Sequence, residues 1–267
     1  MSKWSTSRRH RRIGARAGLS VVLSLSTVGV AYAADDPPSA AAGTPALPPV
    51  VVAFGDSVPY ASHCGCPGFV GEYATLAGNN AGFAATVHNF SDPGSLSGDV
   101  VSELGHHRIQ KAVRAATTVL IMTGANDFTA PFSEVRDGAS ESDVYPPAAD
   151  RVQANVTAAV QLVQQLNPHA HIVVLDYWAA MKDGAVARRE YSPDAQEAAQ
   201  DATDAVNQAL ADAVEATHVT YVSTLVAFKG PDGTQDPTDL LAPDGDHPDA
   251  AGHAVIAQTL VEALPQG

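Results

Sequence analysis

Residues 49–57 read PVVVAFGDS, an apolar, valine-rich run that stops abruptly at Gly-Asp-Ser. A short β-branched run that meets turn-forming residues in this way is typical of a buried strand ending in a tight turn. Four more such runs follow, spaced widely enough to hold helices between them, at residues 84–90, 118–123, 171–177 and 219–223. Five strands separated by helices predict parallel crossovers, and therefore a flavodoxin-like, three-layer α/β/α sandwich around a five-stranded parallel sheet.

The helices between the later strands can be read from apolar spacing. Residues 151–166 repeat apolar side chains at helical intervals, with Asp150 as a candidate cap and Pro168 just past the end. Two more helices are expected over residues 193–217 and 248–264, and each begins at a proline, which suits a first helical turn.

Two stretches lack a clear period. Residues 128–147 contain Pro131, Pro146 and Pro147 and are predicted to form a loop after the third strand. Residues 229–243, rich in Asp, Gly and Pro, occupy the same place after the fifth strand. Ligands of open α/β sheets bind beyond the carboxyl ends of the strands, so both stretches are expected to border a binding site.

Residues 1–33 have the layout of a secretory signal. A basic stretch precedes an apolar run over residues 17–30, and the segment ends in the small-residue sequence Ala-Tyr-Ala. Serines and a threonine interrupt the run, which is shorter than the about 20 apolar residues that a bilayer span needs. We therefore expect cleavage after Ala33, secretion, and no stable membrane anchor. The arginine pairs leave the general and the twin-arginine export routes both open.

The chain beyond the signal is strongly acidic. Six of the 15 Lys and Arg residues lie in residues 1–33 and none of the 29 Asp and Glu residues do, so the remainder carries 9 minus 29, a formal charge of −20. Such a surface repels nucleic acid and anionic lipid headgroups and favours neutral or cationic substrates. Acidic residues also keep exported proteins soluble, so the charge excludes nucleic acid without identifying a partner.

The domain organisation is simple. Residues 34–48, rich in Ala and Pro, are predicted to be a flexible leader, and residues 49–267 suit a single α/β domain, which we expect to be monomeric. Cys64 and Cys66 are the only cysteines, and a disulfide between them would close a very small loop with little entropic gain. The sequence leaves its formation open; if formed, it would stiffen the loop after Ser57.

Polar residues gather where the predicted strands end. A serine hydroxyl becomes an effective nucleophile when an imidazole takes its proton, and the imidazole needs a carboxylate that fixes its tautomer and stabilises its charged form. The chain supplies all three groups in order, and it lacks the Gly-x-Ser-x-Gly elbow of the ordinary α/β-hydrolases. The four blocks are Gly55-Asp56-Ser57, Asn89 with Gly94, Gly124-Ala125-Asn126-Asp127, and Asp244-Gly245-Asp246-His247-Pro248.

In their order and placement, these blocks resemble the SGNH, or GDSL, family of esterases and lipases over nearly the whole chain after the signal. The resemblance implies that Ser57 is the nucleophile, His247 the general base and Asp244 the carboxylate that orients it. It further implies an oxyanion hole made by the backbone N–H groups of Ser57 and Gly94 and the side-chain amide of Asn126. Fixed donors of this kind stabilise the charge that develops on an ester carbonyl oxygen.

The implied protein is a carboxylic-ester hydrolase that needs no metal or cofactor and works through an acyl-enzyme. Its substrate would be a small-molecule, lipid or acylated-carbohydrate ester. Two positions depart from the family pattern: Ala61 stands where many members have glycine, and Pro93 precedes Gly94. The first concerns the pocket wall, and the second the direction of the Gly94 N–H.

Several side chains have competing interpretations. Asp246 is a rival to Asp244, but it directly precedes His247, and adjacent side chains seldom point the same way. Asp56 and Asp127 are expected to hold turns through hydrogen bonds to backbone. His63 with the two cysteines lacks the ligand set of a zinc site. Trp178 and Tyr60 are each assigned equally to a substrate site or to packing, and His106 and His107 are expected at the surface.

Three other functions are compatible with the sequence. A carbohydrate O-deacetylase would share the machinery and differ in the pocket. A non-catalytic cell-surface binding module would keep only the fold. Transfer of the acyl group to an alcohol would run through the same intermediate as hydrolysis.

Overall fold

The computed structural model describes residues 48–264. The predicted signal, residues 1–33, lies outside this range, as does all of the predicted leader except Pro48. The five predicted strands form one parallel sheet in the order β2-β1-β3-β4-β5, which confirms the predicted flavodoxin-like fold class. Their bounds are β1 Val50–Gly55, β2 Thr86–Asn89, β3 Thr118–Met122, β4 His171–Leu175 and β5 Thr220–Val222.

Strand β1 is an interior strand of the sheet and pairs on both sides, whereas β3 is the middle strand of the five. Val51 lies opposite Val87 of β2 and Thr118 of β3, and the register continues to Gly55 opposite Met122. Residues of β1 and β3 are almost completely buried, as expected for parallel strands covered on both faces. Strand β2 lies at one edge and is exposed along its length.

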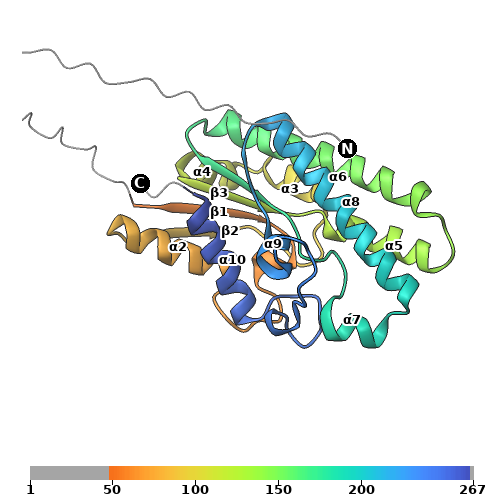
Figure 1. The fold of residues 1–267 in the computed structure, drawn as a ribbon. Helices are drawn as coiled ribbons and strands as arrows, with labels where there is room; N and C mark the ends of the chain where they lie inside the picture. Colours follow the sequence, from red (N-terminus) through yellow and green to blue (C-terminus); the bar gives the residue numbers. More distant parts are fainter. Residues whose placement is uncertain (1–47, 265–267) are drawn as a thin grey trace, which may run out of the picture. The chain divides into compact units, whose positions relative to one another are not determined.

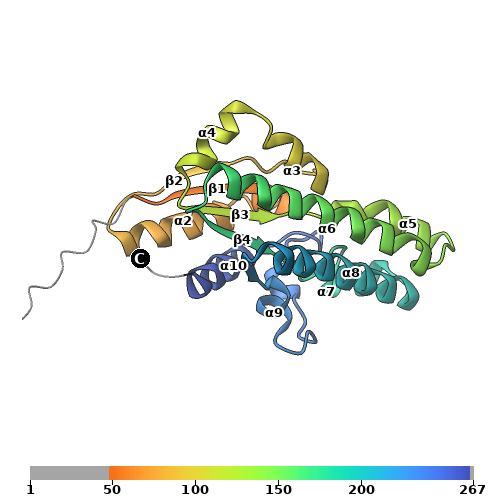
Figure 2. The same cartoon turned by 90° about the horizontal axis from the view of Figure 1, so that it is seen from above.

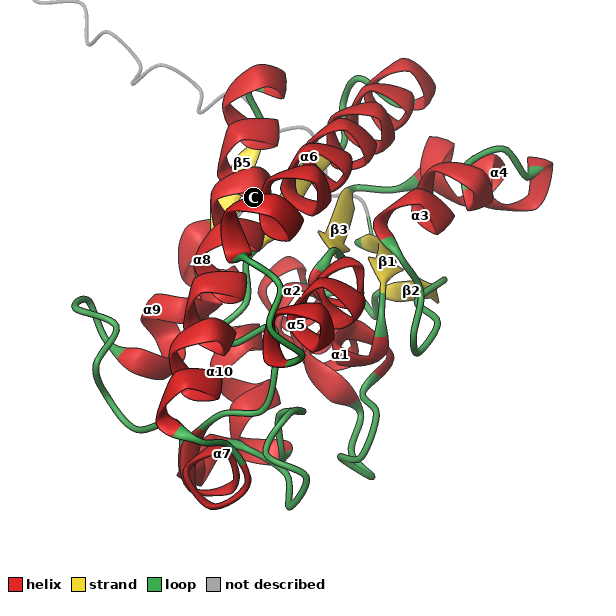
Figure 3. Cartoon of the chain, turned by 90° about the vertical axis from the view of Figure 1, so that its right-hand side faces the viewer, coloured by secondary structure: helices red, strands yellow, loops and turns green. Residues whose placement is uncertain are grey.

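Helices cover both faces of the sheet (Figures 1 and 2). Helices α2 (Gly68–Ala81) and α10 (Ala250–Ala263) pack together on one face. The opposite face carries α3 (Ser97–Glu103), α4 (His107–Ala115), α6 (Glu141–Leu166) and α8 (Pro193–Thr217). Figure 3 shows the strands enclosed by the surrounding helices. The remaining elements are short: α1 Ser57–Tyr60, η1 Ala125–Phe128, α5 Thr129–Arg136, α7 Gly184–Glu190, α9 Thr224–Lys229 and η2 Thr238–Leu240.

The prediction of a loop over residues 128–147 is wrong. Helix α5 fills its first half, and α6 begins at Glu141, ten residues before the predicted start at Arg151. Two prolines in the early part of α6 obscured the pattern, because proline removes a helical hydrogen bond. Tertiary packing offsets this cost: Tyr145 is buried and its hydroxyl donates to the Ala198 carbonyl of α8 at 2.9 Å.

Helix α8 has the bounds predicted for it. Ser192 caps it by accepting the Ala195 N–H at 3.2 Å, and Pro193 occupies the first turn. Its buried face is rich in alanine, which lets α8 lie close against α6 (Figure 2). None of the helices within residues 48–264 is both long and apolar enough to cross a bilayer.

We predict that Ala202→Leu lowers the free energy of unfolding by about 1–3 kcal/mol, because Ala202 is fully buried in α8 and a larger side chain overpacks the interior. Urea denaturation measures the change. Ala216→Leu, at an exposed position of the same helix, is the matched control and should change stability by less than about 0.5 kcal/mol. Equal effects of the two substitutions would contradict close packing of this helix face.

Candidate active site

The first block turns sharply where β1 ends. Gly55 has a φ of 143°, and a Cβ added there would lie 1.8 Å from the Met122 carbonyl oxygen, so only glycine fits. The Asp56 N–H donates to that same oxygen at 3.3 Å, and the Asp92 N–H donates to the Gly55 carbonyl at 3.0 Å. These bonds tie the turn to β3 on one side and to the loop after β2 on the other.

Ser57 is the first residue of α1, directly after this turn. Asp56 caps the helix, because its Oδ1 accepts the Val58 N–H at 3.0 Å. Its Oδ2 accepts the Tyr177 hydroxyl at 2.5 Å. Burial raises the pKa of Asp56 to about 6, although both hydrogen bonds oppose the rise. Asp56 therefore holds the turn, as predicted.

A chain of hydrogen bonds joins Ser57 to the last block. His247 Nε2 lies 2.8 Å from Ser57 Oγ, and His247 Nδ1 lies 2.8 Å from Asp244 Oδ2. Asp246 Oδ2 is 4.0 Å from the same Nδ1, beyond hydrogen-bonding distance. The structure thus places Asp244 against the imidazole, as the prediction preferred.

Asp244 is suited to orient an imidazole. Burial alone would raise its pKa, but hydrogen bonds from the backbone N–H of Asp246 and from the ring and N–H of His247 outweigh burial and place the pKa below its usual value. A charged Asp244 favours a proton on Nδ1 of His247. The Nε2 lone pair then faces the hydroxyl of Ser57.

The two other blocks lie at the same edge of the sheet. Asn126, on η1, donates from Nδ2 to the Ser95 carbonyl at 3.0 Å, and an amide nitrogen retains a second hydrogen for another acceptor. Gly94 is exposed with a φ of 84°, and a Cβ there would meet nothing within 4 Å. Glycine at position 94 is therefore favoured by its left-handed backbone conformation and not by close packing.

Asp127 also holds structure, as predicted. Its carboxylate accepts the N–H and the hydroxyl of Ser97 at 2.8 and 2.9 Å, which joins the third block to the start of α3.

A cavity of about 410 Å³ opens beside Asn126. The segment that was predicted as a loop forms much of its wall, now as helix, so this segment does border the site. Apolar and polar side chains line the cavity in similar number. The apolar ones are Leu96, Ala130, Pro131, Val144 and Pro147, and the polar or charged ones are Asn126, Asp127, Glu134, Asp143 and Arg151.

The burial of Trp178 and the exposure of Tyr60, His106 and His107 show where these four side chains lie. Trp178 is buried and stacks on Phe228 with ring centroids 4.3 Å apart, so it belongs to the core. Tyr60 is exposed. His106 and His107 lie at the surface, as predicted.

Sequence reasoning missed the contact of His63 with this site. Its ring stacks on the His247 ring, with centroids 4.8 Å apart and an interplanar angle of 25°. No spacing signal could have found the contact, because the two histidines lie far apart in the sequence and meet only in the folded chain.

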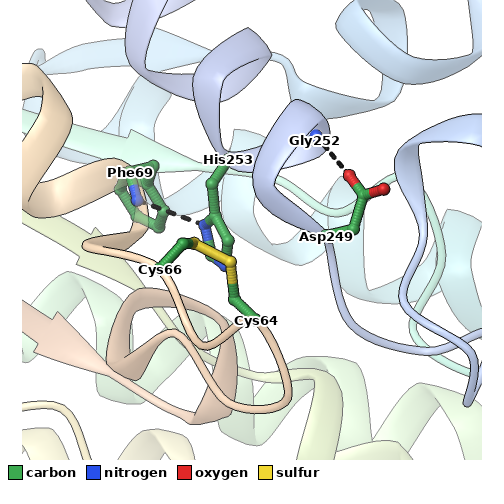
Figure 4. Close-up of a disulfide and its surroundings, with 6 residues drawn as sticks. All are labelled: Cys64, Cys66, Phe69, Asp249, Gly252 and His253. Atoms are coloured by element: carbon green, nitrogen blue, oxygen red, sulfur yellow. Dashed lines mark hydrogen bonds between the residues drawn. A yellow bond between two sulfur atoms is a disulfide. The ribbon is translucent and has the colours of Figure 1, made fainter.

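The two cysteines form a disulfide, and buried His253 lies beside it (Figure 4). Burial lowers the pKa of His253 to about 4, so its ring is neutral at pH 7. Its Nδ1 accepts the Phe69 N–H at 3.2 Å, which places the remaining proton on Nε2. That nitrogen has no hydrogen-bond partner among the described residues. A protonated Nε2 does not ligate a metal, and the two sulfurs are bonded to each other.

One other cluster of potential metal ligands occurs within residues 48–264. His63, Asp244 and His247 each offer one ligand atom, and these atoms lie within 4.8 Å of one another. Both nitrogens of His247 are already engaged by Ser57 and Asp244, so these contacts compete with an ion.

A serine, an imidazole and a carboxylate joined by hydrogen bonds at the carboxyl edge of an α/β/α sheet are typical of serine hydrolases. The chain belongs to the GDSL-like lipase/acylhydrolase family, whose model matches residues 53–255. It is therefore a serine ester hydrolase, and the resemblance seen in the sequence is confirmed. A search among curated proteins found no significant match.

Solved structures of similar fold include lipases and esterases. The lipase Lip_vut3 from a goat rumen metagenome has 18% identity and a TM-score of 0.66, covering 80% of this chain and 97% of its own. An extracellular lipase from Streptomyces rimosus has 18% identity and a TM-score of 0.57, covering 81% and 100%. Axe2, an acetylxylan esterase from Geobacillus stearothermophilus, has 18% identity and a TM-score of 0.59, covering 83% and 98%. At these identities the likeness shows the fold alone.

We predict that His253 makes stability fall with acid. Its folded pKa of about 4 lies below the ordinary value of 6.5, so its contribution is complete above pH 6.5 and is lost as the pH falls toward 4. The loss amounts to about 3 kcal/mol relative to a non-titrating His253→Gln variant.

Urea denaturation of both proteins between pH 7.5 and 4.5 measures this difference. The raised pKa of Asp56 acts in the opposite direction, but it is present in both proteins and cancels in the comparison. A stability difference that stays constant with pH would contradict a buried neutral His253.

Proposed function

We propose that this protein is an exported carboxylic-ester hydrolase in which Ser57 is the nucleophile, His247 the general base and Asp244 the orienting carboxylate. The observation that carries the proposal is the continuous hydrogen-bond chain from Asp244 through His247 to Ser57, with both links at 2.8 Å. Export is inferred from the layout of residues 1–33, and a disulfide suits an oxidising compartment.

The reaction begins when Ser57 Oγ attacks the ester carbonyl and His247 Nε2 takes the hydroxyl proton. Asp244 stabilises the imidazolium that results. Collapse of the tetrahedral intermediate expels the alcohol, which receives its proton from Nε2, and leaves an acyl group on Ser57. Water, activated by the same nitrogen, then releases the acid and restores the serine.

The negative charge on the former carbonyl oxygen needs fixed donors. The Ser57 N–H lies in the first turn of α1, where helical N–H groups have no partner within the helix. Asn126 has an amide hydrogen beyond the one given to Ser95. With the Gly94 N–H, these groups form the proposed oxyanion hole, in which one donor typically contributes a factor of about 100 to 1000 in rate.

The lining of the cavity favours a second candidate within the same chemistry, a carbohydrate O-deacetylase. Glu134, Asp143 and Arg151 supply hydrogen-bonding groups suited to a hydroxyl-rich alcohol. The formal charge of −20 beyond the signal disfavours anionic lipid surfaces. An ester with a short acyl chain on a neutral polyhydroxylated alcohol fits both observations.

We predict that Ser57→Ala lowers kcat for a simple ester by about a millionfold, to background, by removing the group that becomes acylated. An organophosphonate should label Ser57 in the native protein and fail to label the variant, as measured by intact mass. Thermal unfolding serves as the folding control. Turnover well above background in the variant would rule out the mechanism, and an unlabelled native protein would favour the binding module.

We predict that kcat/KM falls as the acyl chain of a p-nitrophenyl ester grows from acetate to decanoate, and that acetylated polysaccharide is deacetylated. A cavity whose wall is half polar and half apolar gains less from a long apolar chain than an apolar groove would. The acyl series and the release of acetate from acetylated xylan measure the preference. A rising acyl series without acetate release would exclude the deacetylase and identify a lipase.

A further inference from the structure

His63 lies against the His247–Asp244 pair. Its ring stacks on that of His247, and its Nδ1 lies 3.6 Å from Asp244 Oδ2, the oxygen that His247 also contacts. The His63 side chain is 62% exposed, whereas that of His247 is 13% exposed. His63 therefore covers one face of the inner imidazole and separates it from solvent.

The backbone at His63 is held in an uncommon conformation. Its φ is 61°, in the left-handed region that residues other than glycine rarely adopt. Ala61, two residues earlier, is also left-handed with a φ of 68°. Cys64, the next residue, is joined to Cys66, so a covalent bond follows directly after the residue that needs its backbone held.

The disulfide is in turn seated on the helix that follows His247. His253, on α10, lies beside both sulfurs (Figure 4). The N-cap of α10 is Asp249, two residues after His247. The short segment from His247 to His253 thus carries the imidazole at one end and contacts the disulfide at the other, which keeps His63 next to His247.

We propose that His63 is a positioning residue for the Asp244–His247 pair, and that the Cys64–Cys66 disulfide holds it in place. The inference rests on the proposed function of Ser57, His247 and Asp244. The stacked ring limits rotation of the His247 imidazole away from Ser57. It also shields the hydrogen bond between His247 and Asp244 from water.

The first test compares His63→Ala with His63→Phe. Removing the ring should lower kcat about tenfold with KM within about twofold, because misplacement of a reacting group costs turnover more than binding. Phenylalanine restores a stacked ring without charge, so it should recover kcat to within about twofold.

A His63→Ala enzyme with the native kcat would overturn the positioning role. So would a His63→Phe enzyme as impaired in kcat as His63→Ala. Because the His63 side chain is exposed, its replacement should not disturb folding, and thermal unfolding of each variant checks this. If His63 has no positioning role, the Ser57→Ala variant is still expected to be inactive. If the Ser57→Ala variant hydrolyses ester, the proposed function itself is wrong.

The second test reduces the disulfide, whose cysteines are partly exposed, with a water-soluble phosphine. The reaction consumes one water and gives two thiols and one phosphine oxide; a thiol count by mass after alkylation confirms it. Reduction should lower kcat of the native protein toward that of His63→Ala. It should leave His63→Ala itself unchanged, because effects that act through one residue are not additive.

A Cys64→Ala/Cys66→Ala double variant should reproduce the reduced protein and be insensitive to the phosphine. If reduction leaves the native kcat unchanged, or lowers kcat by the same factor in the native protein and in His63→Ala, the disulfide does not act through His63 and that part of the proposal is wrong.

Discussion

The close approach of Gly55 to the Met122 carbonyl is the constraint on which the rest of the site depends. No side chain fits there, because a Cβ would lie 1.8 Å from that oxygen. Glycine lets the chain leave the interior strand β1 abruptly while hydrogen bonds to β3 and to the loop after β2 hold the turn. Ser57 therefore stands at the carboxyl end of a buried strand that is paired on both sides, where a site can be held to small tolerances.

Opposite that strand end, the C-terminal segment supplies the imidazole. Asp244 holds the turn before α10 by accepting two backbone N–H groups, and it contacts His247 with its other oxygen. Helix α10 packs on α2, and His253 receives the Phe69 N–H at the contact between them. The packing of α10 on α2 thus helps to fix the position of His247 relative to Ser57. It explains how two residues 190 positions apart in the sequence bring Nε2 and Oγ to 2.8 Å.

Much of the fold was predictable, for identifiable reasons. The buried strands carry apolar runs, and α8 has both an N-cap serine and a first-turn proline, so its bounds matched. Residues 128–147 were misjudged because Pro146 and Pro147 break the local pattern, and the burial of Tyr145 against α8 that outweighs them is a tertiary contact. The placement of Trp178 in the core depended in the same way on its contact with Phe228, which lies 50 residues further along the chain.

Local patterns in the sequence were enough to predict the order of the strands along the chain, the grouping of a serine, an imidazole and a carboxylate in one cluster, and the family. Each of these depends on local periodicity or short motifs. The folded chain was needed to show that Asp244 and not Asp246 contacts His247, that a mixed polar and apolar cavity opens beside Asn126, and that His63 stacks on His247. The physical reason is that these depend on side-chain direction and on packing between distant segments, which no local pattern encodes.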